Sequence, residues 1–426
     1  VNESINEEWI TDKVRFNYDG YYQQRIDQPY IKKSSKLEPS SWADAIKILK
    51  SKLKNSNPLA LIGEHTDLET GFAIKKFMAH FGKDNIECRT DNQSILPNLD
   101  SYRFNTPIAN LEEADLVILC GTNPKIESPI INHKIFKSYN AGTEIFNIGE
   151  DISLNYPTHY LGQTLNDLDN DLLKKHLKKA TNPILIVGSG FLNQFNSDNT
   201  LKALFSFASK NKIITANKNN LNFLSPHASR VGQLLLGNTT DDICHPFTKL
   251  KKKSFDTVLS FSSEHIADTA FKESFKVYFG HHGDEGAMNA DIVLPTPLYT
   301  EKNGIFVNIE GRPQEAKKCH NPIGEAKEEW KILKELSNQL SLNFEINTFD
   351  ELRAELSKDH PNLVNFHEII DSAEKYEDQS DILFESIPCV YPIKNFYMSD
   401  IISKNSKTMA KCVEDIISKP LLEKSA

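Results

Sequence analysis

The sequence predicts an α/β protein with two doubly wound lobes, each built on a parallel sheet. Short apolar runs alternate with helical patterns through the middle of the chain, as expected for strand–helix–strand units. Some of these runs, such as residues 116–120 and 292–294, have no polar face, which is typical of strands buried on both sides. Glycine or proline ends several of the runs. The alternation is long enough for two lobes.

The N-terminal part has a different character. Residues 2–28 are polar and rich in aromatic side chains but show no helical period, so we expect short strands and turns from the end of a β-rich module. Residues 29–39 are predicted to be a linker. Ser41 then has the features of an N-cap, with Asp44 three residues later as in a capping box. The helix that it begins is expected to end before Pro58.

The alternating region follows this first helix. Ser128 and Pro129 mark the start of one of its helices, because proline at the first helical position loses no hydrogen bond. Strands are predicted at 59–62, 116–120, 144–148, 184–187, 213–216, 257–261 and 277–279, and helices at 69–81, 129–139, 167–179 and 201–209.

The stretch from residue 281 to 314 combines strands with charged elbows. We expect a strand at 292–294, a polar elbow, a second strand at 305–309 and a second elbow. The elbows carry Glu301, Lys302, Glu310 and Arg312. Such residues can build an active site or a buried ion network that holds two lobes together. We favour the structural network, because clusters of perturbed charge are often structural.

The C-terminal part is predicted to continue as a tail. An amphipathic helix is expected over 324–340, and a capping-box pattern, Thr348 with Glu351, starts another that reaches about residue 357. From residue 360 the chain is polar with isolated apolar anchors, so we expect it to wrap over the main body or a partner, with a short helix over 406–417. The expected domains are 1–38, the β-rich remnant and linker; 39–345, the α/β region with a break between lobes near 150–180; and 346–426, the last helix and tail.

Composition narrows the class of protein. A net charge of −9 argues against nucleic acid as a partner, since binding phosphates needs a basic surface. No apolar run approaches the roughly 20 residues that span a bilayer, so direct membrane insertion is not expected. The six cysteines include no Cys-x-x-Cys pair, which argues against a metal or iron–sulfur site and fits a reducing compartment. The chain begins at Val1, so we expect a processed, split or truncated product.

Two glycine turns are candidates for ligand binding. Gly121, Thr122 and Asn123 follow a strand and precede a helix, a place where a phosphate could approach the backbone, although a tight turn explains the same residues. Gly188 and Gly190 also follow a strand but lack the third glycine of a dinucleotide fingerprint. The adjacent residues 281–282 are both histidine, but on an extended chain they would point to opposite faces and could not share one metal ion.

Several longer motifs resemble known families. Residues 114–119, the turn at 121–124 and residues 290–314 are similar to the molybdopterin oxidoreductase superfamily, which implies two Rossmann-like lobes. A narrower resemblance, to the largest iron–sulfur subunit of respiratory complex I, rests on His281–Ala287, Glu301-Lys302, Glu328–Ile332 and Asn6–Lys13. Ile393–Asp400 and Thr408–Cys412 resemble the mitochondrial form of that family.

The resemblance also implies what this chain lacks. The redox centres of the family are ligated in an N-terminal half that precedes the matching residues. Thr11 stands where some bacterial relatives place a cysteine, and Ser94 is the only residue of 91–94 that could replace the molybdenum ligand of active enzymes. We therefore expect no catalytic, cofactor-binding or metal residue. The vestigial cofactor cleft, with Gly121, Thr122, Asn123, Gly188 and Gly190 as its candidate residues, is expected to be empty or filled by side chains.

The function implied is that of a structural scaffold without an activity of its own. The chain would support electron transfer from NADH to ubiquinone in the hydrophilic arm of complex I, at the matrix side of the mitochondrial inner membrane. The implied partners are the N-terminal iron–sulfur half of the same subunit, the flavoprotein subunit and the quinone-side subunits. Iron–sulfur clusters and FMN are expected in those chains. The alternative is a degenerate oxidoreductase that still binds molybdopterin or a nucleotide beyond Gly121.

Overall fold

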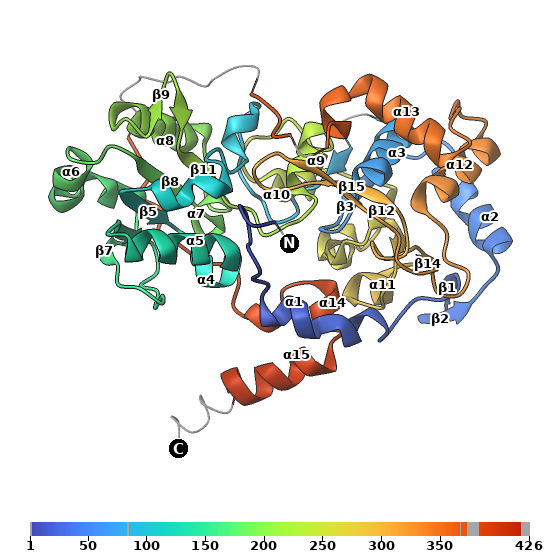
Figure 1. Ribbon diagram of the computed structural model, residues 1–426. Helices are drawn as coiled ribbons and strands as arrows, with labels where there is room; N and C mark the ends of the chain where they lie inside the picture. The colour runs from blue at the N-terminus through green and yellow to red at the C-terminus, as the bar shows by residue number, and fades with distance from the viewer. Residues whose placement is uncertain (1, 83–84, 367, 373–382, 419–426) are drawn as a thin grey trace.

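A computed structural model describes residues 2–82, 85–366, 368–372 and 383–418. Two sheets lie side by side, each within its own lobe (Figure 1). We call the lobe around the seven-stranded sheet, with strand order β2-β1-β14-β13-β12-β3-β4, the first lobe. The lobe around the five-stranded sheet, with order β11-β8-β5-β6-β7, is the second lobe. The prediction of two parallel-sheet lobes is confirmed.

The first lobe is organised by parallel strands that are buried on both faces. These are β4 (Ile86–Glu87), β3 (Pro58–Ile62), β12 (Thr257–Phe261), β13 (Phe275–Gly280) and β14 (Ile292–Pro295). Alternate residues of β3 belong to two different cores: Leu59 and Leu61 to one, Ala60 and Ile62 to the other. This is why the run shows no polar face.

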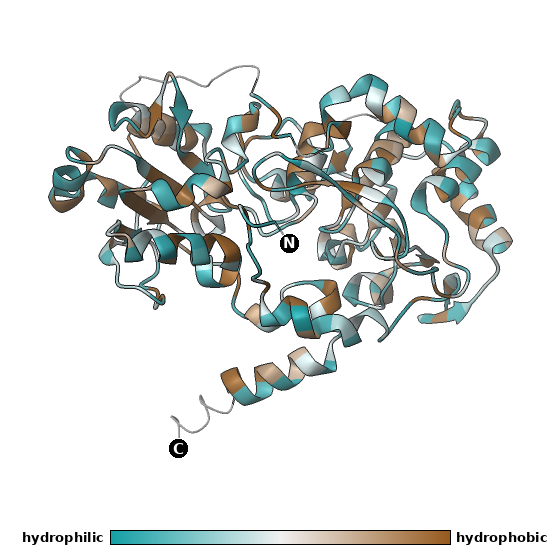
Figure 2. Cartoon of the chain, viewed as in Figure 1, coloured by the Kyte–Doolittle hydropathy of each residue, from teal (hydrophilic) through white to brown (hydrophobic). Residues whose placement is uncertain are grey.

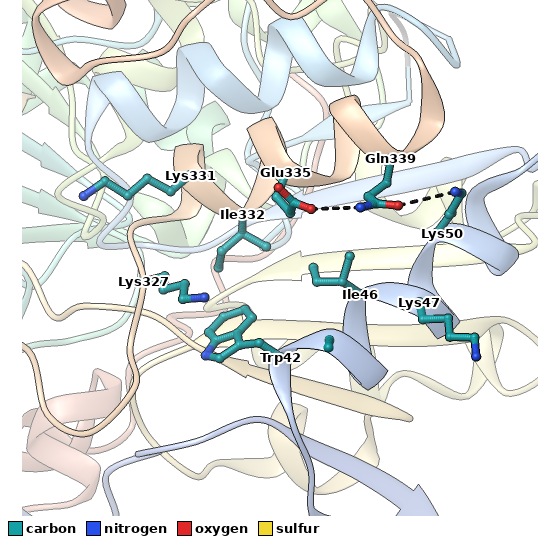
Figure 3. Close-up of a pocket in the computed structure, with 10 residues that line it drawn as sticks. Trp42, Ile46, Lys47, Lys50, Lys327, Lys331, Ile332, Glu335 and Gln339 are labelled. Atoms are coloured by element: carbon teal, nitrogen blue, oxygen red, sulfur yellow. Dashed lines mark hydrogen bonds between the residues drawn. The ribbon is translucent and has the colours of Figure 1, made fainter.

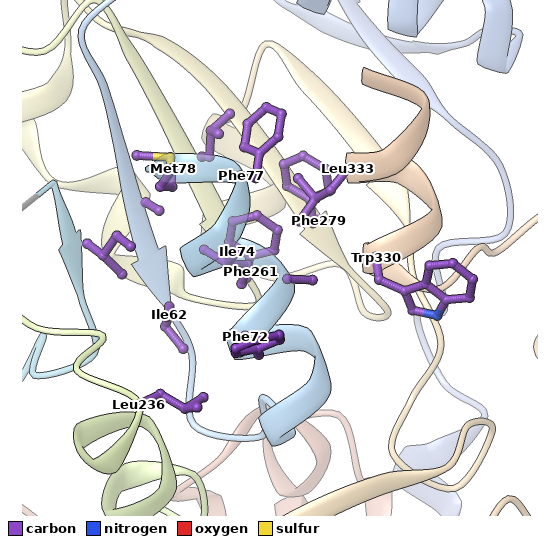
Figure 4. Close-up of a cluster of buried hydrophobic side chains, with 14 of the residues drawn as sticks. Ile62, Phe72, Ile74, Phe77, Met78, Leu236, Phe261, Phe279, Trp330 and Leu333 are labelled. Carbon is purple, nitrogen blue, oxygen red and sulfur yellow. The ribbon is translucent and has the colours of Figure 1, made fainter. Parts of the chain in front are cut away.

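Helices complete the larger of these cores. The helices α2 (Trp42–Leu53), α3 (Leu68–Met78), α12 (Glu329–Leu340) and α13 (Phe349–Asp359) contribute to it. Phe77 from α3 and Leu333 from α12 pack with Phe261 and Phe279 of the central strands (Figure 4). Shorter helices close the other face, among them α10 (Pro246–Leu250) and α11 (Glu285–Asn289).

The second lobe has the same construction. Its strands are β5 (Leu116–Cys120), β6 (Glu144–Ile148), β7 (His159–Gly162), β8 (Pro183–Val187) and β11 (Leu221–Phe223), all parallel. The helices around them include α5 (Pro129–Asn140), α6 (Asp171–Leu177), α8 (Asp198–Lys210) and the 3-10 segment η3 (Ile108–Glu113). Figure 2 shows these strands as apolar segments inside the lobe, while the surrounding helices alternate between polar and apolar residues.

The position of the break between lobes differs from the expected one. The chain leaves the first sheet after β4 and returns to it at β12, so the second lobe is an insertion between two segments of the first. A break near 150–180 is wrong, because β6 before this range and β8 after it belong to the same sheet as β7 within it. The short elements between β6 and β8 interrupt the regular alternation of strand and helix, but the long-range pairing of β8 with β5 places both strands in one lobe.

The N-terminal expectations also need correction. Residues 12–21 form the helix α1 (Asp12–Phe16) and the 3-10 turn η1 (Asn17–Tyr21) instead of strands, with the Thr11 side chain capping α1. The predicted linker at 29–39 is a hairpin of β1 (Tyr30–Lys33) and β2 (Lys36–Pro39). Its strand β1 pairs antiparallel with β14, so this hairpin forms the edge of the first sheet.

Other element boundaries hold or shift by a few residues. The helix predicted to begin at Ser41 is α2, and the Ser41 hydroxyl oxygen accepts from the Asp44 backbone N–H at 3.1 Å. The strand expected at 213–216 does not join the sheet of the second lobe. Instead, β9 (Ile214–Thr215) pairs with β10 (Lys218–Asn219) in a separate two-stranded sheet. The helix expected from residue 324 begins five residues later, at Glu329.

The C-terminal tail packs on both lobes where the structure describes it. Cys389 and Val390 donate backbone hydrogen bonds to the second lobe, at the carbonyls of Gln163 (2.9 Å) and Gly190 (3.1 Å). The short helices η8 (Phe396–Met398), α14 (Ile401–Lys404), α15 (Lys407–Cys412) and η9 (Val413–Ser418) follow. They lie with α1 and η1 below the two lobes in Figure 1. The prediction of a tail that wraps over the main body is confirmed for these residues, and part of it, 373–382 and 419–426, lies outside the described residues.

Candidate functional site

A cavity of about 440 Å³ lies between the two lobes. Ligands of open α/β sheets bind beyond the carboxyl ends of the strands, and this cavity is at that end of β3 and β8. The lining residues come from the first lobe, the second lobe, the N-terminal segment and the C-terminal tail. They include Thr11, Lys13, Glu64, His65, Asp91, Glu127, Ser189, Asn193, His227, Ile393, Phe396 and Asp400.

The two predicted glycine turns touch each other at this edge of the second sheet. Gly188 donates its backbone N–H to the Cys120 carbonyl at 2.9 Å, and Gly190 donates to the Gly121 carbonyl at the same distance. Gly121 has a φ of +60°, and a Cβ on it would come within 2.5 Å of the Phe191 ring. The glycines therefore serve a close packing of two turns, which is the tight-turn alternative of the sequence analysis.

A carboxylate of the chain itself occupies the donors of these turns. The Thr122 hydroxyl donates to Glu127 Oε2 at 2.6 Å, and the Ser189 backbone N–H and hydroxyl donate to Glu127 Oε1 at 3.1 and 2.7 Å. Burial raises the pKa of Glu127, against the lowering effect of these hydrogen bonds. The Ser189 N–H, which an incoming phosphate would use, is therefore already hydrogen-bonded to Glu127. Sequence reasoning missed Glu127, although it lies only five residues after Thr122.

Asn123 has the local conformation that the sequence predicted. Its φ of −112° and ψ of 90° are extended, as required before Pro124, and it precedes the short helix α4 (Pro124–Glu127). This helix sets the position of Glu127. Asn123 therefore belongs to the turn that positions the Glu127 carboxylate.

The C-terminal tail seals the glycine turns. A Cβ on Gly190 would lie 2.7 Å from the Cys389 sulfur, and one on Gly149 would lie 3.0 Å from it. Burial raises the pKa of the Cys389 thiol to about 11, so the thiol stays protonated at neutral pH. Tyr391 donates its backbone N–H to Glu150 Oε1 at 3.0 Å and is itself buried. The tail therefore fills the space beside the turns.

Four ionisable side chains form a chain of contacts across the cavity. His227, after β11, contacts Glu64 at 3.3 Å and Asp91 at 3.1 Å, and Arg230 of α9 (Arg230–Leu235) contacts Asp91 at 2.9 Å. Burial alone would lower the pKa of His227, but the two carboxylates outweigh it and raise the pKa to about 9. At neutral pH two cations thus face two carboxylates. His227 was not among the residues predicted from the sequence to form a site.

The two positions expected to be former metal ligands have structural contacts. Thr11 Oγ1 accepts the Val14 backbone N–H at 3.2 Å and caps α1. Ser94 is fully buried and donates its backbone N–H to the Leu192 carbonyl at 2.9 Å. Among the described residues, no three His, Cys, Asp or Glu side chains gather in a way that could hold a metal ion. Within the same residues no helix is both long and apolar enough to cross a membrane.

The first elbow is tied into the first lobe. Glu301 Oε2 accepts from the Arg25 guanidinium at 2.6 Å, and both side chains are buried. The Lys302 ammonium lies 2.7 Å from Asp67 and 2.8 Å from Glu329. Burial would lower the pKa of Lys302, but these two carboxylates outweigh it and hold the pKa above its usual value. The elbow thereby joins α3, α12 and the N-terminal segment.

The second elbow reaches the second lobe. It links β15 (Gly304–Val307) and β16 (Pro313–Ala316), an antiparallel hairpin. Glu310 Oε1 accepts from Arg312 Nε at 2.8 Å, and its Oε2 accepts the Ile108 backbone N–H at 3.0 Å. Phe104 also donates its N–H to the Ile309 carbonyl at 2.8 Å. The four elbow residues thus form two groups, of which the second bridges the lobes.

The histidine pair contradicts the predicted geometry. The Nδ1 atoms of His281 and His282 lie 2.6 Å apart, whereas an extended chain would have separated the rings. The reason is that β13 ends at Gly280 and the chain turns. Burial lowers the pKa of both residues, that of His282 to about 4. His282 Nε2 donates to the Gly20 carbonyl at 2.8 Å, so its Nδ1 accepts from His281.

Comparisons with known proteins cover nearly the whole chain. Residues 25–339 match the family model described as molybdopterin oxidoreductase. Residues 1–19 match the 4Fe-4S domain of "NADH-ubiquinone oxidoreductase NDSU1/NuoG-like", and residues 368–412 match the model for the C-terminal region of the NuoG-type component of NADH-ubiquinone oxidoreductase.

Two curated relatives illustrate the similarity. The NuoG-type component of the NADH-quinone oxidoreductase of Rickettsia bellii is 38% identical over 97% of this chain and 61% of the relative. The mitochondrial "NADH-ubiquinone oxidoreductase 78 kDa subunit" of Candida albicans is 33% identical over 97% of this chain and 60% of the relative. The chain therefore spans about three fifths of the length of these relatives.

A solved structure supports the fold at much lower identity. A chain of the formyltransferase/hydrolase complex from Methylorubrum extorquens, in complex with methylofuran, is similar with a TM-score of 0.54. The identity is 13%, and the match covers 74% of this chain and 98% of that chain.

Proposed function

Because this chain belongs to the molybdopterin oxidoreductase family and is homologous over 97% of its length to the NuoG-type component of NADH-quinone oxidoreductase, we propose that it is a scaffold portion of that component. It supports electron transfer from NADH to quinone without a cofactor of its own. The observation that carries this proposal is the occupied edge of the second sheet, where Glu127 takes the hydrogen-bond donors of both glycine turns and Cys389 packs against them.

The charges around the cavity also favour a scaffold over a binding site for an anionic cofactor. Glu64, Asp91, Glu127 and Asp400 all line the cavity. The cations Lys13 and His227 line the same cavity. The lining therefore offers no surplus of positive charge to the phosphate groups that a pterin or nucleotide carries. The remaining 440 Å³ is nevertheless large enough for a small ligand, and this favours a second candidate, a degenerate molybdopterin- or nucleotide-binding oxidoreductase.

The two elbows are the structural core of the scaffold. Lys302 holds α3 and α12 together through Asp67 and Glu329, and Glu310 binds the backbone of the second lobe. We propose that Glu310 helps to fix the relative orientation of the lobes, whereas Lys302 stabilises the first lobe. The assignment predicts that their loss changes stability and not a chemical step.

Elemental analysis of the purified full chain tests the absence of a cofactor. We expect well below one atom of molybdenum, tungsten or iron per chain, and no pterin fluorescence after acid extraction. Stoichiometric metal or extractable pterin would contradict the proposal. A nucleotide panel in a thermal-shift assay tests the second candidate, because a ligand at 100 times its Kd adds about 2.7 kcal/mol to the stability.

The proposed partners are the iron–sulfur domain, the flavoprotein subunit and the quinone-side subunits of complex I, with the assembly at the matrix side of the mitochondrial inner membrane. An N-terminal apolar patch supports the first of these. Among the described residues, half of the strongly exposed large apolar side chains fall between positions 9 and 22. We define the patch as Trp9, Ile10, Val14, Phe16, Tyr18 and Tyr22.

The patch overlaps the segment similar to a 4Fe-4S domain. That match covers residues 1–19, so most of the patch lies in it. Exposed Trp and Tyr side chains are enriched at protein interfaces. We propose that the patch packs against the remainder of such an iron–sulfur domain.

A binding experiment with the R. bellii relative tests this contact. The probe is the portion of that protein that this chain does not match, purified with its clusters. We expect saturable binding to the full chain, and at least about tenfold weaker binding after Trp9→Ser with Tyr18→Ser, the equivalent of about 1.4 kcal/mol. The matched control replaces Leu172 and Met288, which are exposed elsewhere. Equal loss in the control, or no loss in the patch variant, would contradict the proposal.

A further inference from the structure

A groove lies on the first lobe, far from the turns of the second sheet. It has a volume of about 550 Å³ and is lined by α2, α12 and the residues just before α12 (Figure 3). We call it the basic groove and define it by Trp42, Ala43, Ile46, Lys47, Lys50, Lys327, Lys331, Ile332, Glu335 and Gln339. The floor includes Ile46 and Ile332, while the four lysines are exposed at the rim.

The two walls run in the same direction. At one end the Lys327 ammonium lies 4.4 Å from the centre of the Trp42 ring, and at the other Lys50 donates to Gln339 Oε1 at 3.4 Å. The lining residues of α2 run from Trp42 to Lys50, a length of about 12 Å at a rise of about 1.5 Å per residue. The groove is thus an extended trough that can hold roughly two turns of a helix.

The charge of the groove is opposite to that of the chain. Four lysines and one glutamate line it, a net charge of +3 on a protein with a net charge of −9. Lysine stems extend the apolar surface while their ammonium groups remain in water. A ligand that fits must therefore combine an apolar face with acidic flanks.

We propose that the basic groove is a docking site for an acidic amphipathic helix of a partner protein. Its apolar residues would lie on Trp42 and Ile46, and its carboxylates would face the lysines on both walls. This is the helix-in-groove mode of peptide recognition, with charge complementarity fixing the register. The inference does not depend on the proposed function, because it rests only on the groove's shape and charge.

The test uses the full chain and a labelled probe peptide in a fluorescence-anisotropy titration. The probe is a helical peptide of about 14 residues, ~21 Å long, with leucines on one face and glutamates on its flanks. We expect saturable binding that weakens as salt rises, because the ion pairs are exposed. Lys47→Glu with Lys50→Glu should weaken it at least about tenfold. The matched control, Lys252→Glu with Lys253→Glu, makes the same charge change on the far side of the first sheet and should leave binding unchanged.

Each other result would overturn the proposal. One such result is equally tight binding of a peptide in which lysines replace the glutamates. The others are an unchanged affinity of the Lys47 and Lys50 variant for the acidic peptide, and no binding of that peptide to the parent chain up to about 1 mM. Binding of the chain to anionic lipid vesicles that is lost in the groove variant, without binding of the peptide, would assign the groove to a membrane surface instead. Circular dichroism of each variant confirms that the lysine replacements leave the fold intact.

Discussion

Removing the Lys302 ammonium should strongly destabilise the first lobe. Lys302 is buried between Asp67 and Glu329, at 2.7 and 2.8 Å. Lys302→Met keeps most of the side-chain volume but leaves two buried carboxylates without their cation. Breaking a buried ion pair from one side costs about 3–5 kcal/mol. We expect Lys302→Met to lower the free energy of unfolding by that amount at pH 7.

The loss should depend on pH, and its sign follows from the carboxylates. Without the ammonium, burial and the nearby Asp67 carboxylate raise the pKa of Glu329 in the folded state further above its value in the unfolded state. A group with a raised folded-state pKa costs stability at high pH and progressively less as the pH falls towards its unfolded value near 4.5. The difference in free energy of unfolding between the variant and the parent chain should therefore become smaller from pH 7 to pH 5.

Urea unfolding followed by tryptophan fluorescence measures the effect, because Trp330 is next to Glu329 on α12. Adding Glu329→Gln to Lys302→Met should restore part of the loss, since one buried charge is removed. Lys272→Met is the matched control; Lys272 is exposed, and its replacement should change stability by no more than about 0.5 kcal/mol. A Lys302→Met loss below about 1 kcal/mol at pH 7, or one that does not change with pH, would refute the reasoning.

Three further predictions concern other buried groups. Burial, together with the Asp67 carboxylate, raises the pKa of Glu69 to about 7. Glu69 therefore adds up to about 3 kcal/mol to the free energy of unfolding below pH 4.5, and this contribution is lost as the pH rises through 7. Glu69→Gln should reduce this pH dependence of the free energy of unfolding, as measured by urea titration. Gly190→Ala should lower the Tm because its Cβ would lie 2.7 Å from the Gly121 carbonyl, whereas Gly283→Ala, with its nearest contact at 3.6 Å, should be neutral. Iodoacetamide at pH 7.5 should label the exposed Cys319 and spare Cys389, whose pKa is about 11, as peptide mass mapping would show.

The sequence by itself determined the elements whose signals are local. The runs that became β5 and β14 show no polar face because each strand is covered on both sides, and that pattern is readable without a structure. Ser41 and Thr348 cap the helices that they were predicted to begin, since capping involves residues only three positions apart. The charged elbows between strands were likewise visible in the order of residues.

Tertiary structure alone decided how these elements are combined. The pairing of β8 with β5 places residues 150–180 inside the second lobe, and the pairing of β1 with β14 turns an expected linker into the edge of a sheet. Both depend on hydrogen bonds between strands that lie far apart in the chain, and a local pattern does not encode the partner.

The same limit applied to the site. Thr122, Ser189 and Glu127 come together only when two strand ends meet, and His227 reaches Glu64 and Asp91 from more than a hundred residues away. The residue types at Glu127 and His227 gave no signal, because a buried charged group is stabilised by partners that the fold brings to it, not by its neighbours in sequence.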